Sequence, residues 1–231
     1  MGRDAAEQSP DAVIVIRGEQ LEVVSQFKYL GSMFTSDGML DTEIAHRVAS
    51  ANSAFARLHQ AKVWSSKALS LSTKLQFLQT IVMTVLLYGG ETWSLLDKHL
   101  NPLSVFHMRC LRRICGISLT DHVSNQEILL QCDTFSVNSQ LRNKRLRWFG
   151  HVCRMSDSRL PKMLLHGQVA RQNCRGKPRT MWNDVVLSDV HKLKLHHYIR
   201  DAQNKPVWRE LTCVARTWRP WLRKRFNYYY Y

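Results

Sequence analysis

The sequence predicts a mainly α-helical fold: a short N-terminal β-hairpin or three-strand lead-in, then a compact three-helix bundle and a basic helical extension. Three observations predict it. Short β-branched runs are confined to the first 38 residues, apolar residues then recur with a helical period, and the excess positive charge lies in the last 91 residues. With 231 residues, 45% of them apolar and 22% charged, the chain has an ordinary globular composition and can bury a core.

The lead-in is predicted from two runs and a turn. Val13–Ile16 and Leu21–Val24 are short and β-branched, and Arg17-Gly18-Glu19-Gln20 between them is a plausible hairpin turn. Phe27–Thr35 (FKYLGSMFT) is expected to form a third strand, ended by Ser36-Asp37-Gly38.

Three amphipathic helices are predicted next, because their apolar residues recur on one face of a 3.6-residue period. These core residues are Ile44, Val48, Ala51, Phe55 and Leu58 in the first, Leu75, Leu78, Val82 and Leu86 in the second, and Leu103, Phe106, Cys110 and Ile114 in the third. The expected N-terminal residues are Asp41 or Thr42, Ser72, and Asn101-Pro102, and glycines 89, 90 and 116 are the expected ends.

Further helices are predicted over residues 124–131, 136–155, 178–195 and 206–218, with breaks at Leu160-Pro161 and over 172–178. Gly150 is expected to weaken the second half of the 136–155 helix. The chain is therefore divided into a β lead-in (1–38), a three-helix bundle (39–118), a basic helical region (119–199) and a basic-aromatic tail (200–231).

The distribution of charge points to a polyanionic partner. The net charge is +15, yet residues 1–140 carry 12 basic and 13 acidic side chains, whereas residues 141–180 carry 11 basic and one acidic. Such a chain attracts nucleic acid first and anionic membrane second. The longest apolar run, residues 81–90, is about half of a bilayer span, and the polar first ten residues are no secretory signal. We expect an intracellular protein, nuclear or cytoplasmic, with no membrane partner.

The 136–155 helix is the strongest candidate for phosphate contact. At 100° per residue, Lys144, Arg147, His151 and Arg154 gather within an arc of about 80°, opposite an apolar side that includes Leu141 and Val152. The candidate nucleic-acid-binding residues of this helix are Lys144, Arg145, Arg147, His151 and Arg154. The alternative is a solvated face that is basic without function.

A second cationic element is the loop that carries Arg171, Arg175, Lys177 and Arg179. Its Arg175-Gly176-Lys177-Pro178 resembles the minor-groove element called an AT-hook. The tail Trp218–Phe226 mixes aromatic and cationic residues as single-strand binders do, although a disordered terminus explains it equally well.

Metal and catalytic motifs are absent from the sequence. His151, Cys153, His166 and Cys174 are neighbours in sequence but lack the tightly spaced pairs of a zinc site, so we expect no metal and no cofactor. No Asp-Asp pair, glycine-rich phosphate loop or nucleophile motif occurs, so we expect no small-molecule substrate and no catalysis.

Several motifs, taken in order, resemble the later part of non-LTR (LINE-type) retrotransposon reverse transcriptases. They are Phe27–Ser32 (FKYLGS), Glu43-Ile44 with Arg47, Leu86–Gly89 (LLYG) with Glu91–Trp93 (ETW), Leu111–Arg113 with Gly116-Ile117, Arg145–Trp148 with Gly150-His151 and Arg154-Met155, and Gly176–Pro178 with Trp182 and Asp184. The resemblance covers about residues 20–190. It implies that Phe27, Lys28, Tyr29, Leu30 and Gly31 form a primer grip. It also implies that the bundle and the basic region are a thumb and post-thumb region that holds an RNA or DNA template–primer duplex.

The same resemblance exposes a departure. The polymerase carboxylates of that family lie in a Tyr-x-Asp-Asp motif upstream of the FKYLGS element, and the 26 residues before Phe27 contain none. No endonuclease is recognisable either. The resemblance therefore implies a truncated remnant that binds template–primer and lacks catalysis. The alternatives are a helical protein–protein interaction module, a non-functional pseudogene product, and an AT-hook-type DNA-tethering protein.

Overall fold

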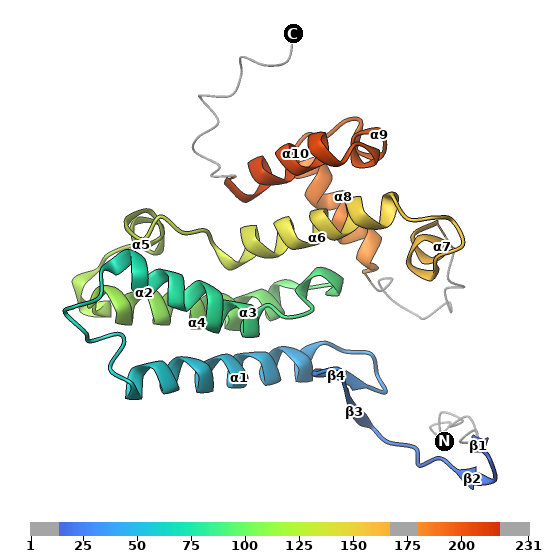
Figure 1. Ribbon diagram of the computed structural model, residues 1–231, viewed down its shortest axis with the longest axis horizontal. Coiled ribbons are helices and arrows are strands. Elements are labelled where there is room, and N and C mark those ends of the chain that lie inside the picture. Colours follow the sequence, from blue (N-terminus) through green and yellow to red (C-terminus); the bar gives the residue numbers. More distant parts are fainter. Residues whose placement is uncertain (1–13, 167–179, 218–231) are drawn as a thin grey trace, which may run out of the picture.

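The computed structural model describes residues 14–166 and 180–217 and confirms the mainly α-helical fold (Figure 1). Two small antiparallel hairpins precede the helices. The helices of the described ranges are α1 (Asp41–Gln60), α2 (Leu71–Phe77), α3 (Met83–Leu86), α4 (Asp97–Cys115), α5 (Asn125–Gln131), α6 (Val137–Cys153), α7 (Leu160–His166), α8 (Trp182–Lys192), α9 (Tyr198–Gln203) and α10 (Lys205–Thr217).

The first hairpin pairs β1 (Val15–Ile16) with β2 (Glu19–Gln20) around a turn at Arg17-Gly18, which is tighter than the predicted four-residue turn. Its strands are correspondingly shorter than the predicted runs.

The predicted third strand over 27–35 is wrong, because this segment reverses direction in its middle. It forms a second hairpin of β3 (Gln26–Tyr29) and β4 (Ser32–Thr35). Leu30 and Gly31 both have positive φ angles, 47° and 88°, which make a two-residue turn that matches the twist of a hairpin.

The three predicted amphipathic stripes meet in one core. Helix α1 supplies the first stripe; α2, one π-helical turn (Leu78–Val82) and α3 form a continuous second helix; and α4 supplies the third. The fully buried members are Ile44, Ala51, Leu78, Val82, Leu86, Leu103, Phe106, Cys110 and Ile114. Val48, Phe55, Leu58 and Leu75 are partly buried against the same core. The Phe55 ring stacks on Trp64 with centroids 4.8 Å apart.

The predicted helix starts need correction at all three N-termini. Leu40 precedes α1, so Asp41 lies in its first turn rather than capping it. The hydroxyl of Ser70, not Ser72, caps α2 by accepting a hydrogen bond from the Thr73 backbone N–H. Helix α4 begins at Asp97 instead of Asn101, because the imidazole Nδ1 of His99 accepts the Leu96 N–H at 3.2 Å.

The C-terminal half contains two helices that were not predicted, α7 and α9. Residues 160–166 form α7 where a break was expected at Leu160-Pro161, since proline at the second position of a helix loses no hydrogen bond. The other predicted break, over 172–178, lies outside the described residues. Helices α5, α6, α8 and α10 fall within or close to their predicted ranges.

Helix α6 lies between two cores (Figure 1). Leu141, near its start, is buried in the core of the three-helix bundle, whereas Leu146 and Phe149 are buried in a second core with Val190 and Trp208. Two helices, α9 and α10, lie in the C-terminal segment for which a basic-aromatic tail was expected from residue 200, and α10 packs on α6. None of the helices within the described ranges has the length and apolar character needed to traverse a bilayer.

Candidate nucleic-acid interface

An open groove of about 750 Å³ runs along α6 and α10. Six basic side chains line it: Lys144, Arg147, His151 and Arg154 from α6, and Lys205 and Arg209 from α10. Glu91 is the acidic residue among its lining residues. The stripe predicted from helical periodicity therefore faces one groove, and a second helix adds to its charge.

The two helices run antiparallel, and hydrogen bonds hold them together. Asn143, near the start of α6, donates to the Thr212 carbonyl near the end of α10 at 2.5 Å. Between these ends, the Trp208 indole N–H donates to the Leu146 carbonyl at 2.7 Å. Gly150 permits this arrangement, because a Cβ there would lie 2.1 Å from Trp208 Nε1. The glycine thus serves packing between helices.

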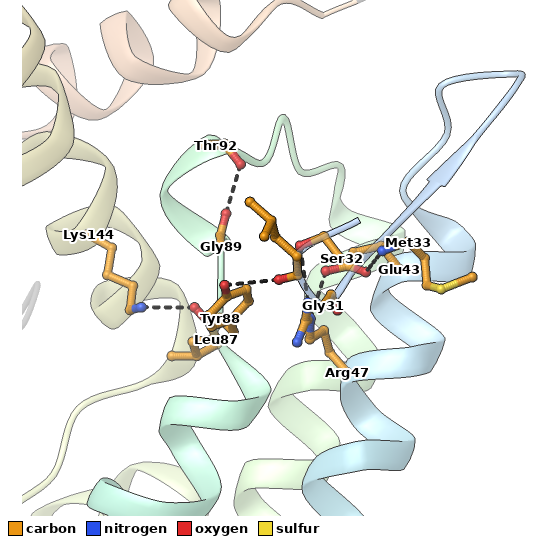
Figure 2. Close-up of polar contacts among 11 residues, drawn as sticks. Gly31, Ser32, Met33, Glu43, Arg47, Leu87, Tyr88, Gly89, Thr92 and Lys144 are labelled. Carbon is orange, nitrogen blue, oxygen red and sulfur yellow. Dashed lines mark hydrogen bonds and ion pairs between the residues drawn. The ribbon is translucent and has the colours of Figure 1, made fainter. Parts of the chain in front are cut away.

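Two of the predicted cations hold the groove in shape. The Lys144 ammonium donates to the Leu87 carbonyl at 2.9 Å, as Figure 2 shows, and lies 3.7 Å from the Glu91 carboxylate. The Arg154 guanidinium donates to the Ala202 carbonyl at 2.5 Å, which ties α6 to α9. Both side chains are partly exposed in the groove, so each has a structural contact besides its charge.

The other cations of the groove are free to meet a ligand. Arg147, His151, Lys205 and Arg209 are exposed. Over residues 14–166 and 180–213, no hydrogen-bond or ion-pair partner holds the side chains of Arg147, Lys205 and Arg209. Lys205 and Arg209 were missed by the sequence analysis. Their four-residue spacing on a helix, on either side of a buried tryptophan, is the signal that could have found them.

Arg145, which the sequence analysis grouped with these cations, does not line the groove. Its side chain is buried at 3% exposure and forms an ion pair with Asp189 of α8, with Nη2 and Oδ2 2.7 Å apart. Arg142 binds the same carboxylate. Position 145 lies beside Val152 and Leu141 on the buried side of α6, so only an acid from another helix makes a charge tolerable there.

The second predicted cationic element lies outside the described residues. Arg171, Arg175, Lys177 and Arg179 all fall within 167–179, as does Cys174. The AT-hook hypothesis thus concerns a segment that the structure does not describe.

Over the described ranges, no group of three His, Cys, Asp or Glu side chains is placed to hold a metal ion. Cys153, one of the residues considered for a zinc site, is buried, and this burial raises the pKa of its thiol.

The predicted primer-grip residues form the tip of the second hairpin. Phe27, Lys28 and Tyr29 lie on β3, and Leu30 and Gly31 make its turn. The Phe27 and Tyr29 rings stack with centroids 6.5 Å apart, and Phe34 lies directly opposite Phe27 on β4. All three rings are more than half exposed, so one face of the hairpin is aromatic and open to solvent.

A buried ion pair fixes this hairpin to α1 (Figure 2). Glu43 and Arg47 lie one turn apart, with Arg47 Nε 2.7 Å from Glu43 Oε1. The Arg47 guanidinium also donates to the Gly31 carbonyl at 2.6 Å, and the second Glu43 oxygen accepts the Met33 N–H at 2.7 Å. The hairpin is therefore held by its backbone, which leaves its aromatic side chains free.

The LLYG and ETW motifs connect the hairpin to the groove. The Tyr88 hydroxyl donates to the Leu30 carbonyl at 3.1 Å, while the neighbouring Leu87 carbonyl accepts from Lys144 (Figure 2). Gly89 turns the chain with a φ of 69°, and the Thr92 hydroxyl donates to its carbonyl. Four of the motifs that carry the resemblance, namely FKYLGS, Glu43 with Arg47, LLYG and ETW, thus meet at one junction.

Comparison with known proteins bears on the evolutionary origin of the chain. Residues 54–88, from the second half of α1 to Tyr88 of the junction, match a domain family of unknown function (DUF6451). The chain is similar to a transposon-derived protein. That protein, uncharacterised and from Caenorhabditis elegans, is 24% identical over 213 residues, which cover 88% of this chain and 71% of the relative. No solved structure matches the chain. The similarity indicates a transposon-related origin.

Proposed function

We propose that the chain binds nucleic acid through phosphate contacts in the α6–α10 groove, as a remnant of a retrotransposon RNA-directed DNA polymerase that keeps its template–primer-binding parts. The observation that carries the proposal is the gathering of six basic side chains and one acid in a single groove. Exposed Arg and Lys side chains without internal partners are the usual donors to phosphate oxygens.

The junction of the motifs supports the proposal independently. The resemblance assigns the hairpin to a primer grip and the helices to a thumb. In the structure, Leu87 and Tyr88 link the Leu30 carbonyl of the hairpin to Lys144 of the groove. Two elements expected to contact one nucleic acid are thereby held in a fixed relation to each other.

The proposal includes no polymerase activity for this chain, because its sequence contains no Tyr-x-Asp-Asp motif and no adjacent aspartates. We expect no primer extension by residues 1–231 with Mg²⁺ or Mn²⁺ on an RNA or DNA template. Extension above the buffer background, abolished by mutation of one of the chain's own aspartates, would contradict this part of the proposal.

The phosphate contacts are tested by salt dependence. The variant R147Q/K205Q/R209Q removes three charges that have no internal role in the described structure. Each cation that meets a phosphate contributes about −0.9 to the log–log slope of affinity against salt on duplex DNA. We therefore expect the slope to flatten by about two to three units and sequence preference to stay unchanged. Lys144 and Arg154 are left intact, because both hold neighbouring carbonyls.

A matched control removes three exposed cations elsewhere. Arg57 lies in the last turn of α1, and Lys62 and Lys67 lie in the connection to α2; all three are exposed and do not line the groove, so R57Q/K62Q/K67Q is the control variant. It lowers net charge by the same amount and should change the slope little. If both triple variants change binding equally, the effect is one of total charge and the groove is not the interface. If the groove variant binds as the parent does, the helical protein-interaction hypothesis replaces this one.

A further inference from the structure

One tryptophan of the groove is placed unlike the others that the structure describes. Trp64, Trp93 and Trp208 are buried at 4% exposure or less. Trp182 packs against the second core and donates its indole N–H to the Glu91 carbonyl at 2.8 Å. Trp148 belongs to neither core, is only partly buried, and lines the groove.

The surroundings of Trp148 are cationic. Arg147 precedes it, and His151, one turn further along α6, has its ring centroid 5.4 Å from that of the indole. Across the groove lie Lys205 and Arg209 of α10. The part of the Trp148 indole that is not buried lies in the groove beside these basic side chains, where a further aromatic group could cover it.

We propose that the groove takes single-stranded nucleic acid, with an unpaired base stacked on the Trp148 indole and the flanking phosphates on Arg147, Lys205 and Arg209. The inference rests on the proposed function and adds the substrate class. Bases in a duplex are stacked on each other and cannot present a face to a side chain, whereas unpaired bases can. The aromatic platform therefore selects single strands, while the cations alone do not.

The dimensions of the groove agree with a short single strand. The α6 residues that line it run from Asn143 to Arg154, a length of about 16 Å at 1.5 Å per residue. Along this length Trp148 lies between Arg147 on one side and His151 and Arg154 on the other, so an aromatic side chain is flanked by basic ones, as in single-strand channels. Arg147 and Trp148 are consecutive, so one nucleotide can satisfy both of them.

The test measures binding to three probes: a labelled oligothymidylate of about 12 nucleotides, a duplex of the same length, and the same strand with abasic sites in place of bases. Stacking of one base predicts that Trp148→Ala weakens binding of the single strand about 5- to 100-fold. Trp148→Phe should retain most of the affinity, and duplex binding should change less than about twofold in either variant. The abasic strand should bind the parent as weakly as the intact strand binds Trp148→Ala.

Two controls keep the outcome clear. Leu119→Ala removes an exposed apolar side chain that does not line the groove and should leave the preference for single strands unchanged. R147Q/K205Q/R209Q should weaken single strand and duplex alike, and its failure to do so would reject phosphate binding itself. If Trp148→Ala weakens both probes equally, or if the parent binds abasic and intact strands with equal affinity, the stacking site is rejected while phosphate binding stands.

Discussion

Arg145 of α6 and Asp189 of α8 form a buried ion pair in which Nε and Nη2 of the arginine lie 2.9 and 2.7 Å from one carboxylate oxygen. Arg142 Nε approaches the other oxygen at 3.2 Å. Both oxygens of the single acid are thus used by arginines from successive turns of one helix. The pair joins α8 to α6, and it keeps Arg145 out of the groove between α6 and α10.

Replacement of Arg145 and replacement of Arg147 should therefore have different consequences. Arg145→Ala leaves the buried Asp189 without its closest partner and should lower the free energy of unfolding by about 3–5 kcal/mol. Arg147→Ala, two residues further on, should change it by less than about 0.5 kcal/mol but weaken nucleic-acid binding. Urea unfolding and a binding assay on both variants provide the check. Equal stability of the two variants would mean that the pair contributes nothing.

Gly150 offers a way to disturb the groove without changing a charge. A Cβ at this position would meet the Trp208 indole at 2.1 Å, so Gly150→Ala must displace the ring and α10 with it. We expect a loss of about 1–3 kcal/mol from overpacking, together with weaker binding. The double variant Gly150→Ala/Trp208→Leu should recover part of this lost stability in urea unfolding, because leucine occupies less space than the indole. Full stability of Gly150→Ala alone would contradict the close packing.

Stability should fall with acid because of His107, which is buried in α4. Burial lowers its pKa from 6.5 to about 4, so between these values the unfolded chain takes up a proton that the native chain does not. The contribution is fully present above about pH 6.5 and is lost as the pH falls toward 4, by about 2–4 kcal/mol in total. In His107→Gln this contribution is absent, so the free energy of unfolding should fall less between pH 7 and pH 4.5 than in the parent. Urea unfolding at pH 7, 5.5 and 4.5 measures the difference. Parallel curves for parent and variant would refute the assignment.

Two thiols at the ends of α4 and α5 should form a disulfide on oxidation. The sulfur atoms of Cys115 and Cys132 are 3.3 Å apart, while burial, followed by the hydrogen bond between the two thiols, raises the pKa of Cys132 to about 12. Diamide should oxidise the pair with loss of two protons and two electrons, slowly at pH 7 and faster as the pH rises. Peptide mapping in a Cys213→Ser background identifies the product, and Cys115→Ser is the control. A Cys110 crosslink in its place would contradict the geometry.

The helices were predictable because their signal is local. The stripe from Ile44 to Leu58 depends only on residues three or four apart, and α1 buries it as expected. The turn at Leu30-Gly31 was not predictable in this way, since leucine rarely adopts the φ of 47° that it has there. Arg47 and Tyr88 hold the backbone of this turn from two other elements, and no local pattern records that contact.

The same distinction divides the candidate site. The α6 half followed from the periodicity of Lys144, Arg147, His151 and Arg154. The α10 half did not, because it packs on residues 62 positions away. The same periodicity places Arg145 on the apolar side of α6, but its partner Asp189 lies 44 residues away and no local pattern indicates it. Charge alone could not separate Arg145 from Arg147. What separates them is the side of the helix that Asp189 faces.

Helix α6 also couples the unfolding of the two cores. Its first residues complete the bundle core and its later residues the second core, and no break in the helix lies between them. A rupture of either core leaves half of α6 without packing, and an isolated helix of that length is marginal in water. The two cores should therefore melt together, in one calorimetric transition, and the slowest-exchanging amide protons of both should have a common free energy of opening. The hairpins and loops at the periphery can open locally, whereas we expect the groove between α6 and α10 to open only when both cores unfold.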